Sequence, residues 1–183
     1  MRKFDSSEEK YFDWYLQTLL NNGFIKSYDF NTLSWDLSSK KTYEWEKKMK
    51  LVPNKIMETT ILHPHIYTPD VVVEWNQNAK NLFYQNLEDN EKITTYFYAQ
   101  DDVSRWEIKG DFDYQNMTRL ARVNIKWVME KYGIYVQIVS PNKTFNKTFT
   151  PERYLLTDKS FKPRKLKYKN VKTIREFRDE ILE

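Results

Sequence analysis

The stretch from residue 104 to residue 139 most constrains what this chain can fold into. Residues 104–109 read as a strand, residues 116–132 as a helix, and residues 134–139 as a second strand that Pro141 ends. A strand, a helix and a strand in this order favour a right-handed crossover between parallel strands of one sheet. The predicted fold class is therefore α/β, with a mixed central sheet flanked by helices.

The rest of the chain supplies further elements around this unit. Residues 6–21 read as a helix, because Ser6 and Glu9 have the spacing of a capping box and apolar residues follow at helical period. Strands are expected at 24–30, 55–62 and 67–75, and within an excursion (76–103) at 82–85 and 93–99. Residues 31–54 show no clear period, and a short helix at 42–49 is one interpretation. A last helix is expected at 171–182.

Composition limits both the class of protein and the kind of metal site. With 183 residues, 40% of them hydrophobic and 31% charged, the chain is typical of a soluble globular domain. It has no cysteine, and two histidines, His63 and His65, cannot alone bind zinc. Any metal would therefore be held mainly by carboxylates, which favours Mg²⁺ or Mn²⁺. No apolar run suits a membrane span or a signal peptide, so we expect a cytoplasmic protein, in the host cytoplasm if a phage encodes it.

Positive charge is concentrated near the C-terminus. Residues 141–175 contain eleven Lys or Arg and two acids, a net charge of +9, although the whole chain carries only +4. Such asymmetry suggests a phosphate-rich partner, and a solvated basic surface is the alternative.

Residues 105–110 place a carboxylate and a lysine on one side of a strand. Side chains alternate along a strand, so Glu107 and Lys109 share one face while Trp106 and Ile108 share the other. A carboxylate at this position can hold a metal ion while the lysine meets a phosphate. These are parts that metal-assisted phosphodiester hydrolysis requires.

Two further acids are candidates for the same site. Asp70 follows Pro69 and opens a strand of three valines, which places its carboxylate at the edge of a sheet. Glu9 lies on the apolar stripe of the first helix, where it either completes the capping box, reaches the site, or does both.

The order of these residues resembles that of the PD-(D/E)xK nuclease superfamily. Within it, the chain is similar to phage-type Holliday-junction resolvases of the endonuclease I kind. The likeness covers residues 5–140 and is carried by the residues 6–10, 65–70 and 106–110. The longer excursion at 76–103 and the region 31–62 depart from that family's pattern.

The resemblance implies a Mg²⁺-dependent nuclease that cuts branched DNA in recombination, as a homodimer. It implies that Asp70, Glu107 and the Ile108 carbonyl bind metal, that Glu9 supports a second metal, and that Lys109 contacts the scissile phosphate. The expected domains are a nuclease core at 1–140, including the excursion 76–103, and a basic C-terminal extension at 141–183.

Candidate DNA contacts lie in two places. Arg119, Arg122 and Lys126 form one basic face of the helix 116–132, opposite an expected apolar stripe of Met117, Leu120, Ala121, Asn124 and Val128. In the C-terminal segment the candidates are Arg164, Lys165 and Lys167, which alternate with apolar residues. Ordinary solvated surfaces are the alternative in both places.

The residues thus predict a metal-dependent DNA endonuclease, and the resemblance implies that it resolves Holliday junctions or other branched DNA. A restriction-like or end-processing phage nuclease would use the same side chains on another DNA shape. A non-catalytic DNA-binding module would use the basic segments alone.

Overall fold

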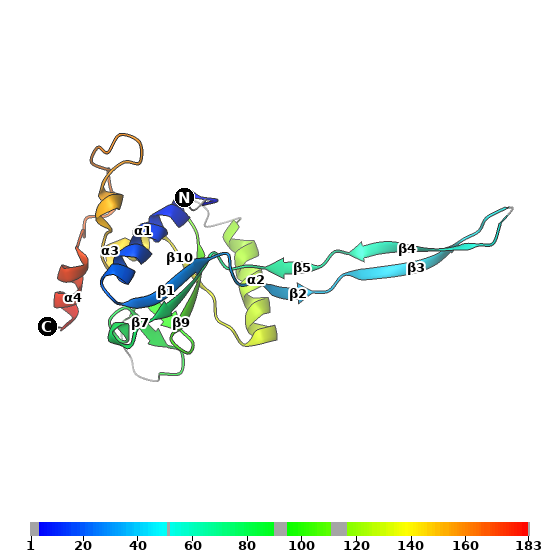
Figure 1. Ribbon diagram of the computed structural model, residues 1–183, viewed down its shortest axis with the longest axis horizontal. Coiled ribbons are helices and arrows are strands. Elements are labelled where there is room, and N and C mark those ends of the chain that lie inside the picture. The colour runs from blue at the N-terminus through cyan, green and yellow to red at the C-terminus, as the bar shows by residue number, and fades with distance from the viewer. Residues whose placement is uncertain (1–3, 51, 90–94, 111–116, 183) are drawn as a thin grey trace.

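A four-stranded sheet forms the centre of the molecule in the computed structural model (Figure 1), which describes residues 4–50, 52–89, 95–110 and 117–182. Its strands are β1 (Ile25–Phe30), β6 (Val71–Trp75), β9 (Val103–Ile108) and β10 (Gln137–Val139), in that spatial order. β1 and β9 run antiparallel to β6, and β10 runs parallel to β9. The prediction of an α/β class with a mixed sheet is confirmed, including the parallel pair on either side of one helix.

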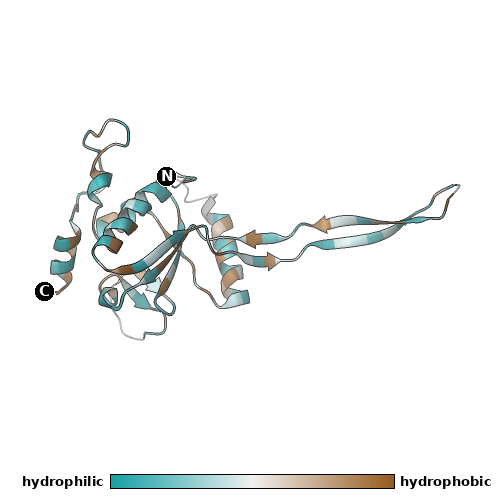
Figure 2. Ribbon diagram, in the orientation of Figure 1, coloured by the Kyte–Doolittle hydropathy of each residue, from teal (hydrophilic) through white to brown (hydrophobic). Residues whose placement is uncertain are grey.

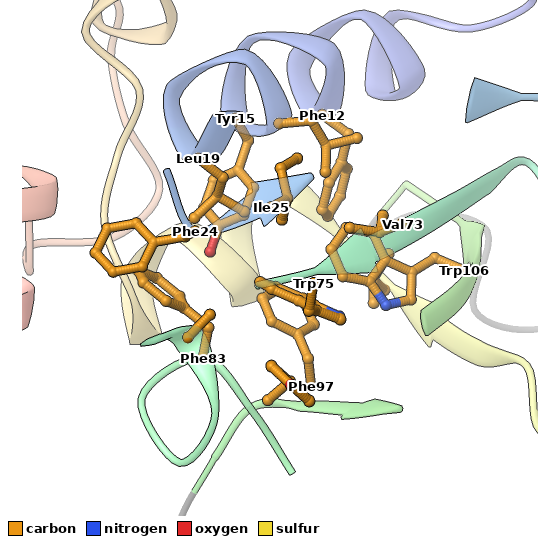
Figure 3. Close-up of a cluster of buried hydrophobic side chains, with 14 of the residues drawn as sticks. Phe12, Tyr15, Leu19, Phe24, Ile25, Val73, Trp75, Phe83, Phe97 and Trp106 are labelled. Carbon is orange, nitrogen blue, oxygen red and sulfur yellow. The ribbon is translucent and has the colours of Figure 1, made fainter. Parts of the chain in front are cut away.

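Helix α1 (Ser7–Asn21) covers one face of this sheet. Ser6 caps its first turn, since the Ser6 hydroxyl accepts a hydrogen bond from the Glu9 amide at 3.2 Å. Phe12, Tyr15 and Leu19 are fully buried against Val73, Trp75 and Trp106 of the sheet, as Figure 3 shows. The helix predicted at 6–21 is confirmed together with its cap.

The C-terminal segment completes the same core. It forms α3 (Pro141–Lys147), the 3-10 turn η2 (Glu152–Leu155) and α4 (Ile174–Leu182). The aromatic side chains that it buries are Phe145, Phe149, Tyr154 and Phe177. The Phe149 ring stacks on Tyr15 at 4.3 Å between centroids. The last helix predicted at 171–182 is confirmed as α4, and the aromatic residues of this segment fill the gap beside α1.

Helix α2 (Met117–Tyr132) packs against a separate small cluster beside the sheet. Its buried Val128 meets Trp35 of β2 (Trp35–Ser38) and Tyr67 of β5 (His65–Tyr67), two strands that pair antiparallel. Leu120, expected on the buried stripe, is instead 59% exposed. Ala121 and Val128 fill the buried face without it. The side chain of Met117 lies outside the described part.

A two-stranded arm extends from this cluster into solvent (Figure 1). It consists of β3 (Lys41–Lys47) and β4 (Lys55–Leu62), which pair antiparallel. The short helix considered at 42–49 is wrong, and the strand at 55–62 is confirmed. Figure 2 shows polar and apolar stretches alternating along the arm. We refer to residues 41–62 as the arm and to β2 and β5 as its root.

The excursion at 76–103 folds back onto the core. It contains the 3-10 turn η1 (Gln77–Ala79) and two short strands, β7 (Tyr84–Asn86) and β8 (Phe97–Ala99), which pair parallel. Phe83 and Phe97 are fully buried, so this segment adds to the core. Both predicted strands are thereby found in part, and residues 90–94 lie outside the described chain. None of the described helices is long and apolar enough to cross a membrane.

Candidate active site

Strand pairing brings Asp70 and Glu107 to the same edge of the sheet. Val71 of β6 lies opposite Trp106 of β9, so the preceding Asp70 faces Glu107 across the two strands. Trp106 and Ile108 point into the main core. The alternation along β9 therefore turns Glu107 and Lys109 to the other face, as the sequence predicted.

Short hydrogen bonds tie these side chains together. The Ile108 amide donates to Asp70 Oδ2 at 2.6 Å, which fixes the carboxylate of one strand on the backbone of the next. Lys109 Nζ lies 2.8 Å from Glu107 Oε1, and the Tyr67 hydroxyl donates to Glu107 Oε2 at 2.7 Å. Glu107 is 7% exposed, so both of its oxygens are held in a largely dry place.

The surroundings of Asp70 disfavour its charged form. Burial, followed by the negative charge of Glu107, raises the pKa of Asp70 to about 7. The Ile108 hydrogen bond and the Lys109 ammonium act in the opposite direction, and the Glu9 carboxylate adds a smaller upward contribution. Two acids so close together, with one lysine beside them, form a site that is short of positive charge.

The first helix brings two acids close to this edge. Glu9 is 7% exposed, and its carboxylate accepts hydrogen bonds from the Ser6 hydroxyl at 3.0 Å and the Asp5 amide at 3.2 Å. Both oxygens are therefore bound to residues at the N-terminal end of the helix. Its neighbour Glu8 reaches the residue after Lys109, because a Cβ built on Gly110 would meet Glu8 Oε1 at 3.1 Å.

The acids at this edge suit Mg²⁺ better than a metal that needs a full set of protein ligands. Within residues 4–50, 52–89, 95–110 and 117–182, no three acidic or histidine side chains form a complete metal-binding group. Mg²⁺ commonly takes one or two carboxylates and fills its other positions with water and substrate phosphate. Asp70 and Glu107 provide such a pair, and the raised pKa of Asp70 indicates that a cation would relieve their repulsion.

The predicted DNA-contacting residues fall into two groups. The side chains of Arg119, Arg122, Lys126, Lys165 and Lys167 are exposed. Arg164 is not, because its guanidinium donates to Asp158 Oδ1 at 2.7 Å and to the Tyr11 hydroxyl at 3.1 Å, and stacks on the Tyr154 ring. Arg164 therefore joins the C-terminal segment to α1, and its contact with DNA stays a prediction.

Two residues of the site were missed in the sequence. Tyr67 was read as the start of a strand continuing to residue 75, whereas β5 ends at Tyr67 and β6 begins at Val71. Its contact with Glu107 depends on that break, and no local pattern indicates it. Glu8 did carry a signal, since Glu8, Phe12, Tyr15 and Leu19 recur at the spacing of one helical face.

Comparisons with protein-family models, with curated proteins and with solved structures found no match to this chain.

Proposed function

We propose that the protein is a divalent-metal-dependent DNA endonuclease that acts on branched DNA, with Asp70, Glu107 and Lys109 at its active site. The observation that carries this proposal is the meeting of these three side chains at one sheet edge. Asp70 lies just before β6 and 37 residues before Glu107 of β9, and the hydrogen bond from the Ile108 amide to Asp70 fixes their relative position.

Each of these side chains has a different role in the proposed hydrolysis. Asp70 and Glu107, with the Ile108 carbonyl, would hold Mg²⁺, which supplies a Lewis acid and lowers the pKa of a bound water. A water oxygen would bond to phosphorus and lose a proton to solvent, while the P–O bond to the leaving nucleotide oxygen breaks and that oxygen takes up a proton from solvent. Lys109 stabilises the negative charge that develops on the phosphate oxygens during this exchange. Tyr67 keeps the Glu107 carboxylate in its orientation throughout.

Exposed basic residues would hold the DNA on either side of the site. α2 begins shortly after Lys109 and presents Arg119, Arg122 and Lys126 to solvent. Lys165 and Lys167 alternate with Leu166 and Tyr168, which pack on the core, and both lysine side chains are exposed. Contacts of this kind position a phosphate backbone without reading its sequence.

The proposal is tested with a labelled four-way junction and a linear duplex of the same sequence, each with Mg²⁺ or with chelator. We expect paired, Mg²⁺-dependent nicks in the junction. Lys109→Ala should abolish cleavage while junction binding in chelator stays within a few-fold. Lys26→Ala is the matched control, because Lys26 forms a 2.9 Å ion pair with Glu74 away from the site.

Other outcomes separate the alternatives. Equal cutting of junction and duplex would support the proposed hydrolysis but contradict selectivity for branched DNA. It would favour a restriction-like or end-processing nuclease. Tight binding without cleavage under any metal would contradict the catalytic proposal and favour a DNA-binding module. A homodimer would place one such site on each of two DNA strands of the junction. Sedimentation of the complex measures how many copies of the protein bind one junction.

A further inference from the structure

The arm contributes no residue to either hydrophobic core cluster of the described chain, and most of its side chains are exposed. Every residue of β3 is exposed, as are six of the eight residues of β4. Large apolar side chains are among them, including Tyr43 at 60% and Ile56 at 72% exposure. A two-stranded ribbon that packs on nothing is at best marginally stable in water. Exposed apolar surface of this extent indicates a binding surface.

The pairing register gives the arm two faces of different chemistry. Residues directly opposite each other share a face, and successive residues alternate. One face, which we call the aromatic face, carries Tyr43, Trp45, Lys47, Lys55, Met57 and Thr59. The other carries Thr42, Glu44, Glu46, Ile56, Glu58 and Thr60. All three glutamates of the paired strands are therefore kept away from the aromatic rings.

Like charges are paired across the strands. Lys47 lies opposite Lys55 on the aromatic face, and Glu44 lies opposite Glu58 on the other. Such pairs destabilise a free ribbon, whereas alternating signs would stabilise it. Lys48 and Lys50 follow in the connecting loop, so residues 47–55 carry four lysines and no acid. The far end of the arm is thus suited to a polyanion.

Trp45 differs from the other tryptophans in its surroundings. Each of the other five tryptophans, Trp14, Trp35, Trp75, Trp106 and Trp127, packs against an aromatic ring. Trp45 packs against no aromatic ring in the described part of the chain, and it is 40% exposed. Its Nε1 donates to Thr59 Oγ1 at 2.9 Å, which holds the indole in place across the ribbon. An exposed, fixed indole that lies next to the Lys47 and Lys55 pair on the same face can stack a nucleobase.

We propose that the aromatic face binds single-stranded nucleic acid, with unpaired bases stacked on Trp45 and Tyr43 and phosphates at Lys47 and Lys55. This site goes beyond the proposed hydrolysis and is separate from it in space. Met57 lies ten residues from Tyr67 of the active site, which at the rise of a strand is roughly 30 Å. The arm would hold an unpaired strand at that distance from the carboxylates.

Binding in chelator tests this site without any cleavage. The probe is a labelled oligothymidylate of about 20 nucleotides, longer than one such site requires, and fluorescence anisotropy gives the affinity. Trp45→Ala should weaken binding about fivefold to a hundredfold, the usual effect of losing one stacked base. Trp45→Phe should recover most of the loss. Lys47→Gln with Lys55→Gln should lower the slope of log affinity against log salt by about 1.4.

Matched variants on the opposite face serve as controls. Ile56→Ala and Glu46→Gln alter the same strands, so they should leave oligothymidylate binding unchanged or slightly stronger. Unfolding curves for each variant establish that the core is intact. Because the binding assay contains no metal, it measures the affinity for oligothymidylate even if the protein does not cleave DNA. Conversely, a failure to bind oligothymidylate does not affect the interpretation of the cleavage assay.

Three outcomes would overturn the proposal. The wild type binds no oligothymidylate, or Trp45→Ala binds as tightly as the wild type. Alternatively, Trp45→Ala halves the sedimenting mass of the free protein with binding unchanged, which would make the aromatic face an interface between two copies.

Discussion

At the scale of single residues, Tyr67 connects the arm root to the proposed active site. Its ring stacks on Trp35 of β2, with centroids 6.1 Å apart, and its hydroxyl donates to Glu107 Oε2. Burial and the Glu107 carboxylate both raise the pKa of Tyr67, so the phenol stays protonated and remains a donor. In the proposed hydrolysis, Tyr67 would therefore act as a positioning residue for Glu107.

Tyr67→Phe removes the hydroxyl and keeps the stacked ring. We expect kcat for junction cleavage to fall about tenfold, as supporting residues around a metal site commonly show, with KM nearly unchanged. Tyr84→Phe is the matched control, because the Tyr84 hydroxyl donates to Asp102 at 2.8 Å outside the site. Equal losses of kcat in both variants would show a general effect of losing a buried hydrogen bond.

The raised pKa of Asp70 predicts a pH dependence of stability with a definite sign. The pKa is about 7 in the folded protein and about 3.9 in an unfolded chain. Between these values the folded state binds more protons, so this group's contribution to stability is full below pH 4 and is lost as pH rises through 7. Asp70→Asn should remove that dependence and stabilise the metal-free protein at pH 8.

Unfolding in urea from pH 5 to pH 8.5 measures the difference between wild type and Asp70→Asn. The difference should widen toward pH 7 by no more than about 1.4 kcal/mol per pH unit. Mg²⁺ should narrow it above pH 7 by binding the ionised carboxylate of the wild type. A difference that does not vary with pH would show that Asp70 titrates normally.

At the scale of elements, substitutions at the beginning of α1 distinguish a capping role of Glu9 from a catalytic one. Glu9→Gln should keep the capping box, since Gln also serves at this position, and should change stability by less than about 0.5 kcal/mol. Ser6→Ala should cost about 1 kcal/mol. Glu8→Gln should reduce cleavage more than Glu9→Gln does, because Glu8 lies beside Gly110 at the catalytic strand.

Cleavage rates and melting curves of these three variants settle the two roles. A large loss of cleavage in Glu9→Gln with unchanged stability would support Glu9 as the acid that the resemblance implied. Loss of cleavage in Ser6→Ala alone would instead show that the position of the whole helix end matters.

Elements with a strong local pattern were predictable from the sequence, and those that depend on distant partners were not. The alternation around Glu107, the cap at Ser6 and the strand at 55–62 are local, and the structure contains all three. The segment 42–49 was misread as a possible helix, although its rings, Tyr43 and Trp45, recur at the period of two that indicates a strand. The break before Val71 and the contact of Tyr67 with Glu107 depend on strands far apart in the chain.

At the scale of the whole molecule, the charge of the C-terminal segment concealed its role in packing. The eleven basic residues at 141–175 suggested an appended extension. Its aromatic residues nevertheless share one core with α1 and the sheet, and Lys10 of α1 pairs with Asp158 at 2.8 Å. Basic residues and core residues alternate along this segment, so one stretch of chain contributes both to stability and to a positive surface.

This packing predicts that the chain cannot be divided at residue 140. Phe145 is fully buried and its ring lies 5.3 Å from Tyr15 and 4.9 Å from Tyr154. Phe145→Ala should therefore cost about 3–5 kcal/mol. Phe161→Ala, in the same segment, should cost less than about 1 kcal/mol, because Phe161 is 62% exposed and meets only the Arg153 guanidinium among the described ring contacts.

Chemical denaturation of both variants and of a chain ending at residue 140 tests this prediction. The shortened chain leaves Tyr15, Phe12 and Phe83 without the rings that cover them, so it should show no cooperative transition. A cooperative transition in the shortened chain, close in midpoint to the wild type, would instead mean that residues 1–140 form an independent domain. In that case the C-terminal rings would pack on a core that is already complete, and the basic segment would be free to evolve as a separate DNA-binding extension.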